Sequence, residues 1–157
     1  MSTSSNRLID PRGPRFGAGI TSVLVISALA FALPSATSPG YGPAWWLSVV
    51  ITALFVWGAL LGPSRPPYGW LFRTLIRPRL KPPTFMEEEA PPRFAQLVGL
   101  FVTLTGLVLH LLGVPYGLVG ALVLTFIASF LNSGFGLCLG CEMYSLLLKW
   151  RGASRQA

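Results

Sequence analysis

Two cysteines separated by two residues are the first feature of this sequence that could do chemistry. They lie in the run Cys138-Leu139-Gly140-Cys141-Glu142, and no other cysteine occurs in the 157 residues. Redox dithiols use this spacing. In such a pair one thiolate attacks a disulfide or persulfide, and the second cysteine resolves the intermediate. Cys138 and Cys141 are therefore the candidate catalytic pair of a thiol-redox or sulfur-handling site.

Two other roles for the cysteines stay open. Free cysteine is among the most buried residue types and often only packs, so the pair could be a helix-packing site. A structural zinc ion needs four ligands, which this chain could supply only with a second copy or a partner. We therefore expect no metal site and no cofactor within the single chain. A cytoplasmic position would also argue against a permanent structural disulfide.

The local structure around the pair has two alternatives. Residues 132–136, with the sequence Asn-Ser-Gly-Phe-Gly, could break the preceding helix. A new helix running from Cys141 to Trp150 would then favour the Cys141 thiolate through its dipole, although the adjacent Glu142 opposes this. Without a break, the three-residue offset would place both sulfurs on one face of a continuous helix.

Few other polar side chains could contribute to a site. The single histidine, His110, lies near the outer end of the third predicted span, about 24 Å along that helix. This distance makes a pairing with the cysteines within one subunit improbable, so His110 is expected to be an interfacial polar residue. Gln96 and Asn132 lie in the cytoplasmic halves of their spans. We expect both amides to point inward, to bond across helices and to line a polar pocket above the cysteines.

The composition indicates which elements hold these residues. Apolar residues make up 52% of the chain and charged residues only 11%, against about 25% charged in soluble domains. This excludes a soluble globular protein and also a disordered chain. About 20 apolar residues cross a bilayer as a helix, and four long stretches carry no charge: 16–33, 44–61, 94–112 and 115–137. The sequence predicts an all-α integral membrane protein, one domain over residues 1–157 with four spans in one bundle.

The basic residues predict the orientation. All 12 Lys and Arg lie before the first span (Arg7, Arg12, Arg15), in the loop 62–93 or in the tail 138–157. Because cytoplasmic loops carry the Lys and Arg excess, both termini of this multi-pass protein should face the cytoplasm from the cell (inner) membrane. The net charge of +7 is then explained by the membrane topology and by attraction to anionic lipids. It does not require a nucleic-acid partner. A cleaved signal peptide ending near Ala32 is the alternative, but the apolar run is long for one.

The central loop contains 8 of the 14 prolines, which disfavours a long helix. Within it, residues 68–77 read as a short basic helix on the membrane surface. Its apolar face is formed by Leu71, Phe72, Leu75 and Ile76. Trp70, Arg73 and Arg77 are its expected lipid-surface contacts. The acidic run Glu87-Glu88-Glu89 reads as a solvated patch.

The chain also carries signs of an internal duplication. Pro14-Arg15-Phe16 recurs 78 positions later as Pro92-Arg93-Phe94, which suggests two parallel two-helix repeats. Two glycine pairs with a spacing of four could allow close helix packing. They are Gly58 with Gly62 and Gly136 with Gly140.

From about Asp10 to Trp150 the sequence resembles an uncharacterised bacterial family of four-span membrane proteins, catalogued as a domain of unknown function. The similarity rests on both Pro-Arg-Phe motifs, on Gly62-Pro63, Pro67-Tyr68-Gly69 and Arg77-Pro78-Arg79-Leu80, and most specifically on the Cys-Leu-Gly-Cys-Glu motif. The family has no established activity. Its members are often encoded near thioredoxin-like or sulfurtransferase-like proteins, so the resemblance implies a soluble partner of that kind.

Three functions remain after these exclusions. The first is a membrane-bound thiol component that uses the cysteine pair. The second is a non-enzymatic membrane anchor or assembly subunit that docks through the basic region 68–81 and the tail. The third is a small-solute transporter, favoured by the repeat and disfavoured by the lack of an intramembrane carboxylate. The sequence does not decide whether the protein is an enzyme, and it does not set the oligomeric state.

Overall fold

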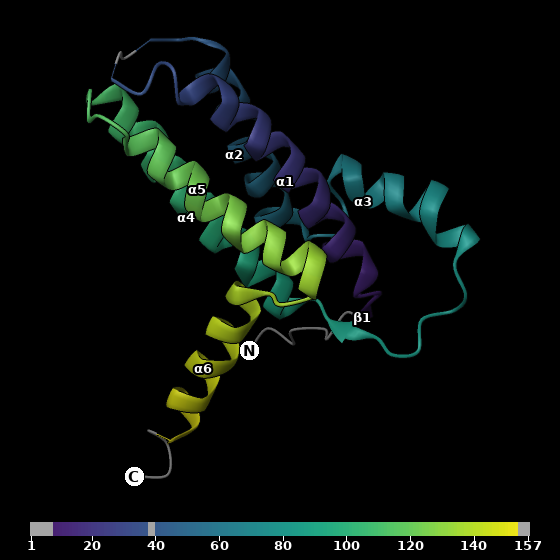
Figure 1. The fold of residues 1–157 in the computed structure, drawn as a ribbon. Coiled ribbons are helices and arrows are strands. Elements are labelled where there is room, and N and C mark those ends of the chain that lie inside the picture. The colour runs from purple at the N-terminus through teal and green to yellow at the C-terminus, as the bar shows by residue number, and fades with distance from the viewer. Residues whose placement is uncertain (1–7, 38–39, 154–157) are drawn as a thin grey trace.

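The computed structural model describes residues 8–37 and 40–153, and its main feature is a bundle of four long helices (Figure 1). These are α1 (Arg12–Ala32), α2 (Pro43–Leu61), α4 (Ala90–Leu111) and α5 (Gly117–Phe130), which continues into the π-helical turn η3 (Leu131–Phe135). All four, with α5 and η3 taken together, are long and apolar enough to cross a membrane. The prediction of an all-helical bundle with four such helices is confirmed. Arg7 and Arg155, used above for orientation, lie outside the described residues.

Two helices begin earlier than predicted. The uncharged stretches began at residues 16 and 94, whereas α1 begins at Arg12 and α4 at Ala90. The added first turns contain Pro14 in α1 and Pro91 and Pro92 in α4. Proline is tolerated there because the first N–H groups of a helix have no partner within it. The first residue of an uncharged stretch therefore lies later in the sequence than the first residue of the helix.

The four helices form a closed ring of contacts. α1 lies against α2 and α5, and α4 lies against the same two helices. The buried Ser48 hydroxyl is satisfied within its own helix, because it donates to the Ala44 carbonyl at 2.8 Å. Between α1 and α5, the Ser22 hydroxyl donates to the Ser129 hydroxyl at 2.9 Å. The apolar core comprises Val25, Ala28, Ala32, Ala44, Ile51, Leu107, Leu118 and Leu122.

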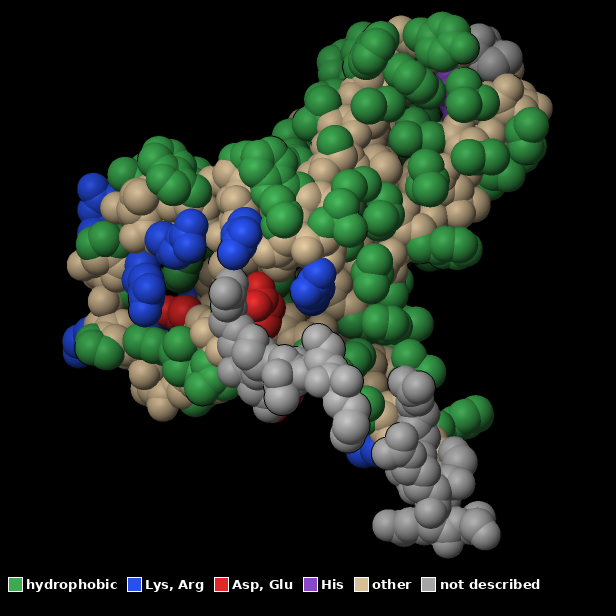
Figure 2. Space-filling view, turned by 180° about the vertical axis from the view of Figure 1, so that it is seen from behind, with side chains coloured by type: hydrophobic (Ala, Val, Ile, Leu, Met, Phe, Trp, Pro, Cys, Tyr) green, Lys and Arg blue, Asp and Glu red, His purple; other side chains and the backbone are tan. Residues whose placement is uncertain are grey.

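The outer surface of the bundle is apolar. Val23, Phe101 and Leu124 are 63%, 72% and 60% exposed, although each sits within a long helix. Figure 2 shows hydrophobic side chains spread over the bundle, while Lys and Arg gather toward one end. Such a surface has the apolar band and charged end expected of a helix bundle surrounded by lipid.

The two halves of the chain have the same order of elements. α1 and α4 each begin two residues before a Pro-Arg-Phe motif, and α2 and η3 each end at a glycine with positive φ, Gly62 at 94° and Gly136 at 67°. The Arg93 side chain donates to the carbonyls of Ala59 and Leu60 at 2.7 Å each. The Arg15 guanidinium lies against Gly136. Each half therefore places an arginine on the end of the other half's second helix.

The central segment forms a short helix where the membrane-surface helix was expected. It consists of α3 (Pro67–Leu71), the π-helical η1 (Phe72–Ile76) and the 3-10 turn η2 (Arg77–Arg79). Its buried side matches the predicted apolar face only in part, because the most buried side chains are Phe72, which belongs to that face, and Tyr68, which does not. The Tyr68 ring packs on Gly17 of α1, and the Phe72 ring lies 5.8 Å from that of Phe16.

A two-stranded sheet joins the N-terminal segment to the acidic run, which the sequence did not indicate. β1 (Leu8–Ile9) pairs antiparallel with β2 (Glu87–Glu88). Two-residue strands are too short to show an alternating pattern, so they leave no signal in the sequence. The acidic run is thus in part a strand, which its interpretation as a solvated patch did not include.

Candidate functional site

The fourth long helix breaks just before the cysteines. After η3, Gly136 adopts a left-handed backbone conformation, which glycine reaches without steric cost. The Leu137 N–H donates to the Leu131 carbonyl at 3.1 Å and closes the helix end. A new helix, α6 (Leu139–Ala153), then leaves the end of the bundle at a steep angle (Figure 1). Of the two alternatives left by the sequence, the structure has the break.

Cys138 occupies the cap position of α6. Its carbonyl accepts the Glu142 N–H at 3.0 Å, and its Sγ accepts the Cys141 N–H at 3.3 Å. A side chain at this position satisfies one of the helix's unpaired N–H groups. The expectation that the helix begins at Cys141 is wrong by two residues, because it begins at Leu139. Cys138 is therefore the cysteine at the positive end of the helix dipole.

The two sulfurs are close enough to bond. The Cα atoms of Cys138 and Cys141 lie 5.2 Å apart, and the pair is joined as a disulfide, at a Cα separation within the usual range for that bond. Both side chains are half-buried. Neither is enclosed among apolar side chains in the way that a purely packing cysteine would be.

Contacts with the start of α4 fix the position of α6. Gly140 packs so tightly on Ala95 that a Cβ at Gly140 would lie 2.6 Å from the Ala95 Cα atom. One turn later, the Tyr144 and Phe94 rings are 5.6 Å apart. Gly140 thus permits the close helix packing that was expected at the glycine pairs. The helix that it packs against is α4.

A polar cavity of about 320 Å³ opens beside the cysteine pair. The Arg15 side chain reaches it from α1, with its guanidinium against Gly136. The cavity therefore combines two sulfurs with charged groups of both signs, at the end of the bundle. Its polar and sulfur-bearing lining comprises Arg15, Glu87, Glu88, Asn132, Cys138, Cys141, Glu142 and Ser145.

Sequence reasoning missed Arg15 as a residue of the site. It entered as one of three basic residues that set the orientation and as part of the repeated Pro-Arg-Phe motif. The available signal was the repeated Pro-Arg-Phe motif, whose second copy gives Arg93 the equivalent place at the end of α2. A basic residue at the same position of both repeats indicates a structural role beyond membrane topology.

The two amides predicted to share a pocket lie at different interfaces. Asn132 is half-buried in the wall of the cysteine cavity. Gln96 is also half-buried, but it packs over Gly58 between α2 and α4 and accepts a long 3.5 Å bond from the Tyr68 hydroxyl. Gln96 is not among the residues that line the cavity. Burial also raises the pKa of Tyr68 to about 12, so that this phenol stays a hydrogen-bond donor.

The residues expected at the lipid surface lie on the central segment. Trp70 is 59% exposed, and Arg73 and Arg77 are also exposed. They belong to α3, η1 and η2, near the end of the bundle where α1 begins. Their exposure leaves them available for headgroup contacts.

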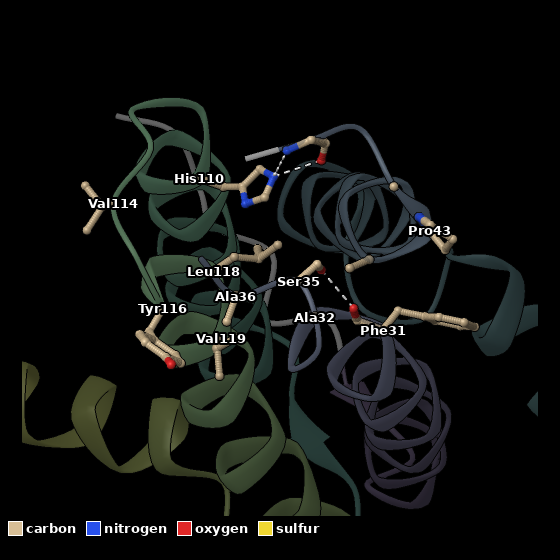
Figure 3. A pocket seen from close by; sticks show the side chains of 13 residues that line it. Phe31, Ala32, Ser35, Ala36, Pro43, His110, Val114, Tyr116, Leu118 and Val119 are labelled. Atoms are coloured by element: carbon tan, nitrogen blue, oxygen red, sulfur yellow. Dashed lines mark hydrogen bonds between the residues drawn. The ribbon is translucent and has the colours of Figure 1, made fainter. Parts of the chain in front are cut away.

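His110 is far from the cysteines, as predicted. It lies in the last turn of α4, about 22 Å along that helix from Ala95, which contacts α6. Its Nε2 atom is 3.0 Å from the Gly40 carbonyl oxygen, and it lines a separate cavity of about 350 Å³ (Figure 3). Within the described residues, no group of three or more His, Cys, Asp or Glu could hold a metal ion.

Comparison with known proteins places this arrangement in a family. No curated protein and no solved structure matches the chain. The family model described as "Domain of unknown function (DUF4395)" matches residues 9–149, a span that includes all four long helices, the cysteine pair and Arg15. The chain therefore belongs to the DUF4395 family.

Proposed function

We propose that this protein is a membrane-bound thiol component whose Cys138–Cys141 pair exchanges electrons or sulfur with a soluble cytoplasmic partner. The observation that carries the proposal is the break before α6. It brings a bonded cysteine pair to a helix N-terminus and beside an open polar cavity. A pair that only packs needs neither the helix cap nor the cavity.

The geometry supports different roles for the two cysteines in this proposal. Cys138 is the nucleophile, because the Cys141 N–H and the α6 dipole both stabilise negative charge on its sulfur. Its thiolate attacks a partner disulfide, forming a Cys138–partner disulfide and releasing one partner thiolate. Cys141 then attacks the Cys138 sulfur, which forms the intramolecular disulfide and releases the second partner thiolate. Two electrons pass to the partner, and the protons of the two cysteine thiols end on the two partner thiols.

A persulfide partner would use the same first step. The Cys138 thiolate attacks the outer sulfur of the partner's persulfide, so that the outer sulfur moves to Cys138 and the partner leaves as a thiolate. Cys141 can then displace that sulfur as hydrosulfide while closing the disulfide. A thioredoxin-like or sulfurtransferase-like protein has the chemistry for one or other of these exchanges.

Thiol labelling in membranes tests the proposal. Membranes containing the full chain are treated with dithiothreitol or with diamide, and remaining thiols are then tagged with a maleimide-polyethylene glycol. We expect two tags after reduction and none after oxidation. The Cys141→Ala variant should take one tag at Cys138 and should also trap a partner as a mixed disulfide, whereas Cys138→Ser should trap none. Thiols that stay unreactive under both conditions would contradict the proposal.

The orientation is part of the same proposal. Both termini face the cytoplasm, supported by the gathering of basic side chains at the end of the bundle that carries α6 (Figure 2). A reporter active only outside the cytoplasm should give no signal when fused at Ala157 and a strong one when inserted near Ser38, which lies outside the described residues. The opposite pattern would place the cysteine site on the outer face.

The anchor function is the second candidate, supported by the exposed basic side chains of the segment Pro67–Arg79. It predicts that a partner still binds after both cysteines are replaced. Co-purification of a partner with Cys138→Ser/Cys141→Ala, lost on replacing Arg73 and Arg77 by Glu, would favour it. If the Cys138→Ser/Cys141→Ala replacement by itself abolishes capture of the partner, the thiol function is favoured.

A further inference from the structure

α6 carries an exposed apolar stripe. Leu139, Met143, Leu146 and Trp150 recur at steps of four, three and four residues, which places them on one face of a helix. These side chains are 39%, 46%, 55% and 77% exposed. Glu142, Ser145 and Lys149 lie on another face. Glu142 and Ser145 also line the cysteine cavity, so the polar face of α6 is the one that bears the site.

The position of α6 limits what can cover the stripe. The helix starts four residues after the fourth long helix ends at Phe135. It is held against Phe94 and Ala95. Ala95 is five residues into α4, which corresponds to about 7 Å along that helix. Amphipathic surface helices bury their apolar face about 5–10 Å into the boundary between headgroups and acyl chains.

The dimensions and charges of α6 fit that layer. Its 15 residues span about 22 Å, too short to cross a 30 Å hydrocarbon core. It leaves the bundle at a steep angle to the long helices (Figure 1), as a helix in the membrane plane must. Lys149 and Trp150 lie within the last five residues of α6. Tryptophan and lysine are residues that favour the interface and anionic headgroups.

We propose that α6 lies in the headgroup layer of an anionic leaflet, with the stripe of Leu139, Met143, Leu146 and Trp150 in the acyl chains and the Cys141–Glu142–Ser145 edge facing water. The lipid surface then sets the direction from which a partner reaches the cysteine pair. This inference rests on insertion of the four long helices into a bilayer. It does not depend on any thiol chemistry.

Spin labels on α6 test the placement. The background is full-length Cys138→Ser/Cys141→Ala, in which serine preserves the cap, reconstituted into phosphatidylcholine vesicles containing phosphatidylglycerol. Labels are attached at Leu146→Cys, in the stripe, or at Leu148→Cys, a matched control on the opposite face that is 51% exposed. We expect a several-fold higher ratio of oxygen to nickel-chelate accessibility at position 146 than at position 148.

Two reference positions calibrate the scale. Phe101→Cys lies in the middle of α4, where the native side chain is 72% exposed, and Thr84→Cys lies in the exposed central loop. Position 146 should resemble the former and position 148 the latter. Equal ratios at both α6 positions, or nickel accessibility at both, would overturn the placement. Spin–spin broadening at position 146 that disappears on dilution with unlabelled protein would show that a second copy covers the stripe, and would also overturn it.

A second measurement avoids the cysteine background. In the wild-type chain, brominated phospholipids should quench a component of the tryptophan emission that is absent from Trp150→Phe. If that component is present but unquenched, Trp150 is outside the acyl region and the proposal fails. Because neither measurement depends on the reactivity of Cys138 or Cys141, failure of the thiol function leaves both readouts intact, and their failure leaves the thiol function standing.

Discussion

Replacing Gly140 by alanine should loosen α6 from the bundle. Carbon atoms in ordinary contact are about 3.5–4.0 Å apart, whereas a Cβ at Gly140 would lie 2.6 Å from both the Cα and the Cβ atom of Ala95. The two helices must therefore separate by about 1 Å. One of the atoms met is backbone, so side-chain rotation cannot relieve the contact.

The energetic cost follows from this displacement. Overpacking of a tight contact costs about 1–3 kcal/mol, and the better helix propensity of alanine returns less than about 1 kcal/mol. A net loss of about 1–2 kcal/mol raises the population of detached α6 about 5- to 30-fold. Amide hydrogen exchange of residues 143–148 should accelerate by that factor in nanodiscs, while exchange in α2 should stay unchanged.

A matched variant lies six residues earlier. A Cβ at Gly134 meets nothing within 4 Å, and Gly134 is not among the residues with positive φ. Gly134→Ala should therefore exchange at the wild-type rate or more slowly, because alanine reduces the entropy of the unfolded chain. Wild-type exchange of α6 in Gly140→Ala would refute the conclusion that the contact with α4 holds this helix.

Three further predictions concern the same end of the molecule. Arg93→Ala removes two bonds to the last carbonyls of α2 and should lower the unfolding free energy by about 1–2 kcal/mol in detergent, with Arg65→Ala as the exposed control. Because the pKa of Tyr68 is raised to about 12, the stability that Tyr68 contributes is complete below its unfolded pKa of about 10 and is lost as pH rises toward 12. The unfolding midpoint of the wild type should therefore fall over this pH range, and it should fall less in Tyr68→Phe. An identical fall in both proteins would contradict the assignment. A side-chain hydrogen bond from Arg12 holds the pKa of Asp10 below its ordinary value. The stability that the Asp10 carboxylate contributes is therefore present above about pH 4 and disappears as pH falls through the native pKa. In Asp10→Asn the unfolding free energy should fall less steeply at acid pH than in the wild type.

The bundle could be predicted from the sequence because its signal is large. The absence of charge over four long stretches is typical of helices that lie in an apolar medium, and the number and order of the long helices followed from it. The starts of α1 and α4 were missed because their first turns contain prolines, and α1 begins with a charged residue. These residues are tolerated there because the first N–H groups of a helix have no partner within it, and hydropathy does not detect this.

The site was predictable only in part. The Cys-x-x-Cys spacing located the pair, and the glycines of residues 132–136 indicated a break. The starting residue of α6 was missed because it depends on which carbonyl accepts the first N–H, a matter of one hydrogen bond at Cys138. Arg15 and Gln96 were misplaced for another reason. Their neighbours come from helices far apart in sequence, and helix pairing cannot be read from a single sequence.

The exchange of arginines between the two halves bears on the order of assembly during synthesis. The last carbonyls of α2 receive their charged donor only when Arg93 emerges, 32 residues after Leu61. Arg15, one of the first side chains synthesised, meets its site only when Gly136 has been added near the other end of the chain. The first hairpin is therefore incomplete on its own, and the ring closes only with the last helix. The same final closure builds the wall beside Cys138, so a nascent chain acquires its cysteine cavity only after the whole bundle is in place.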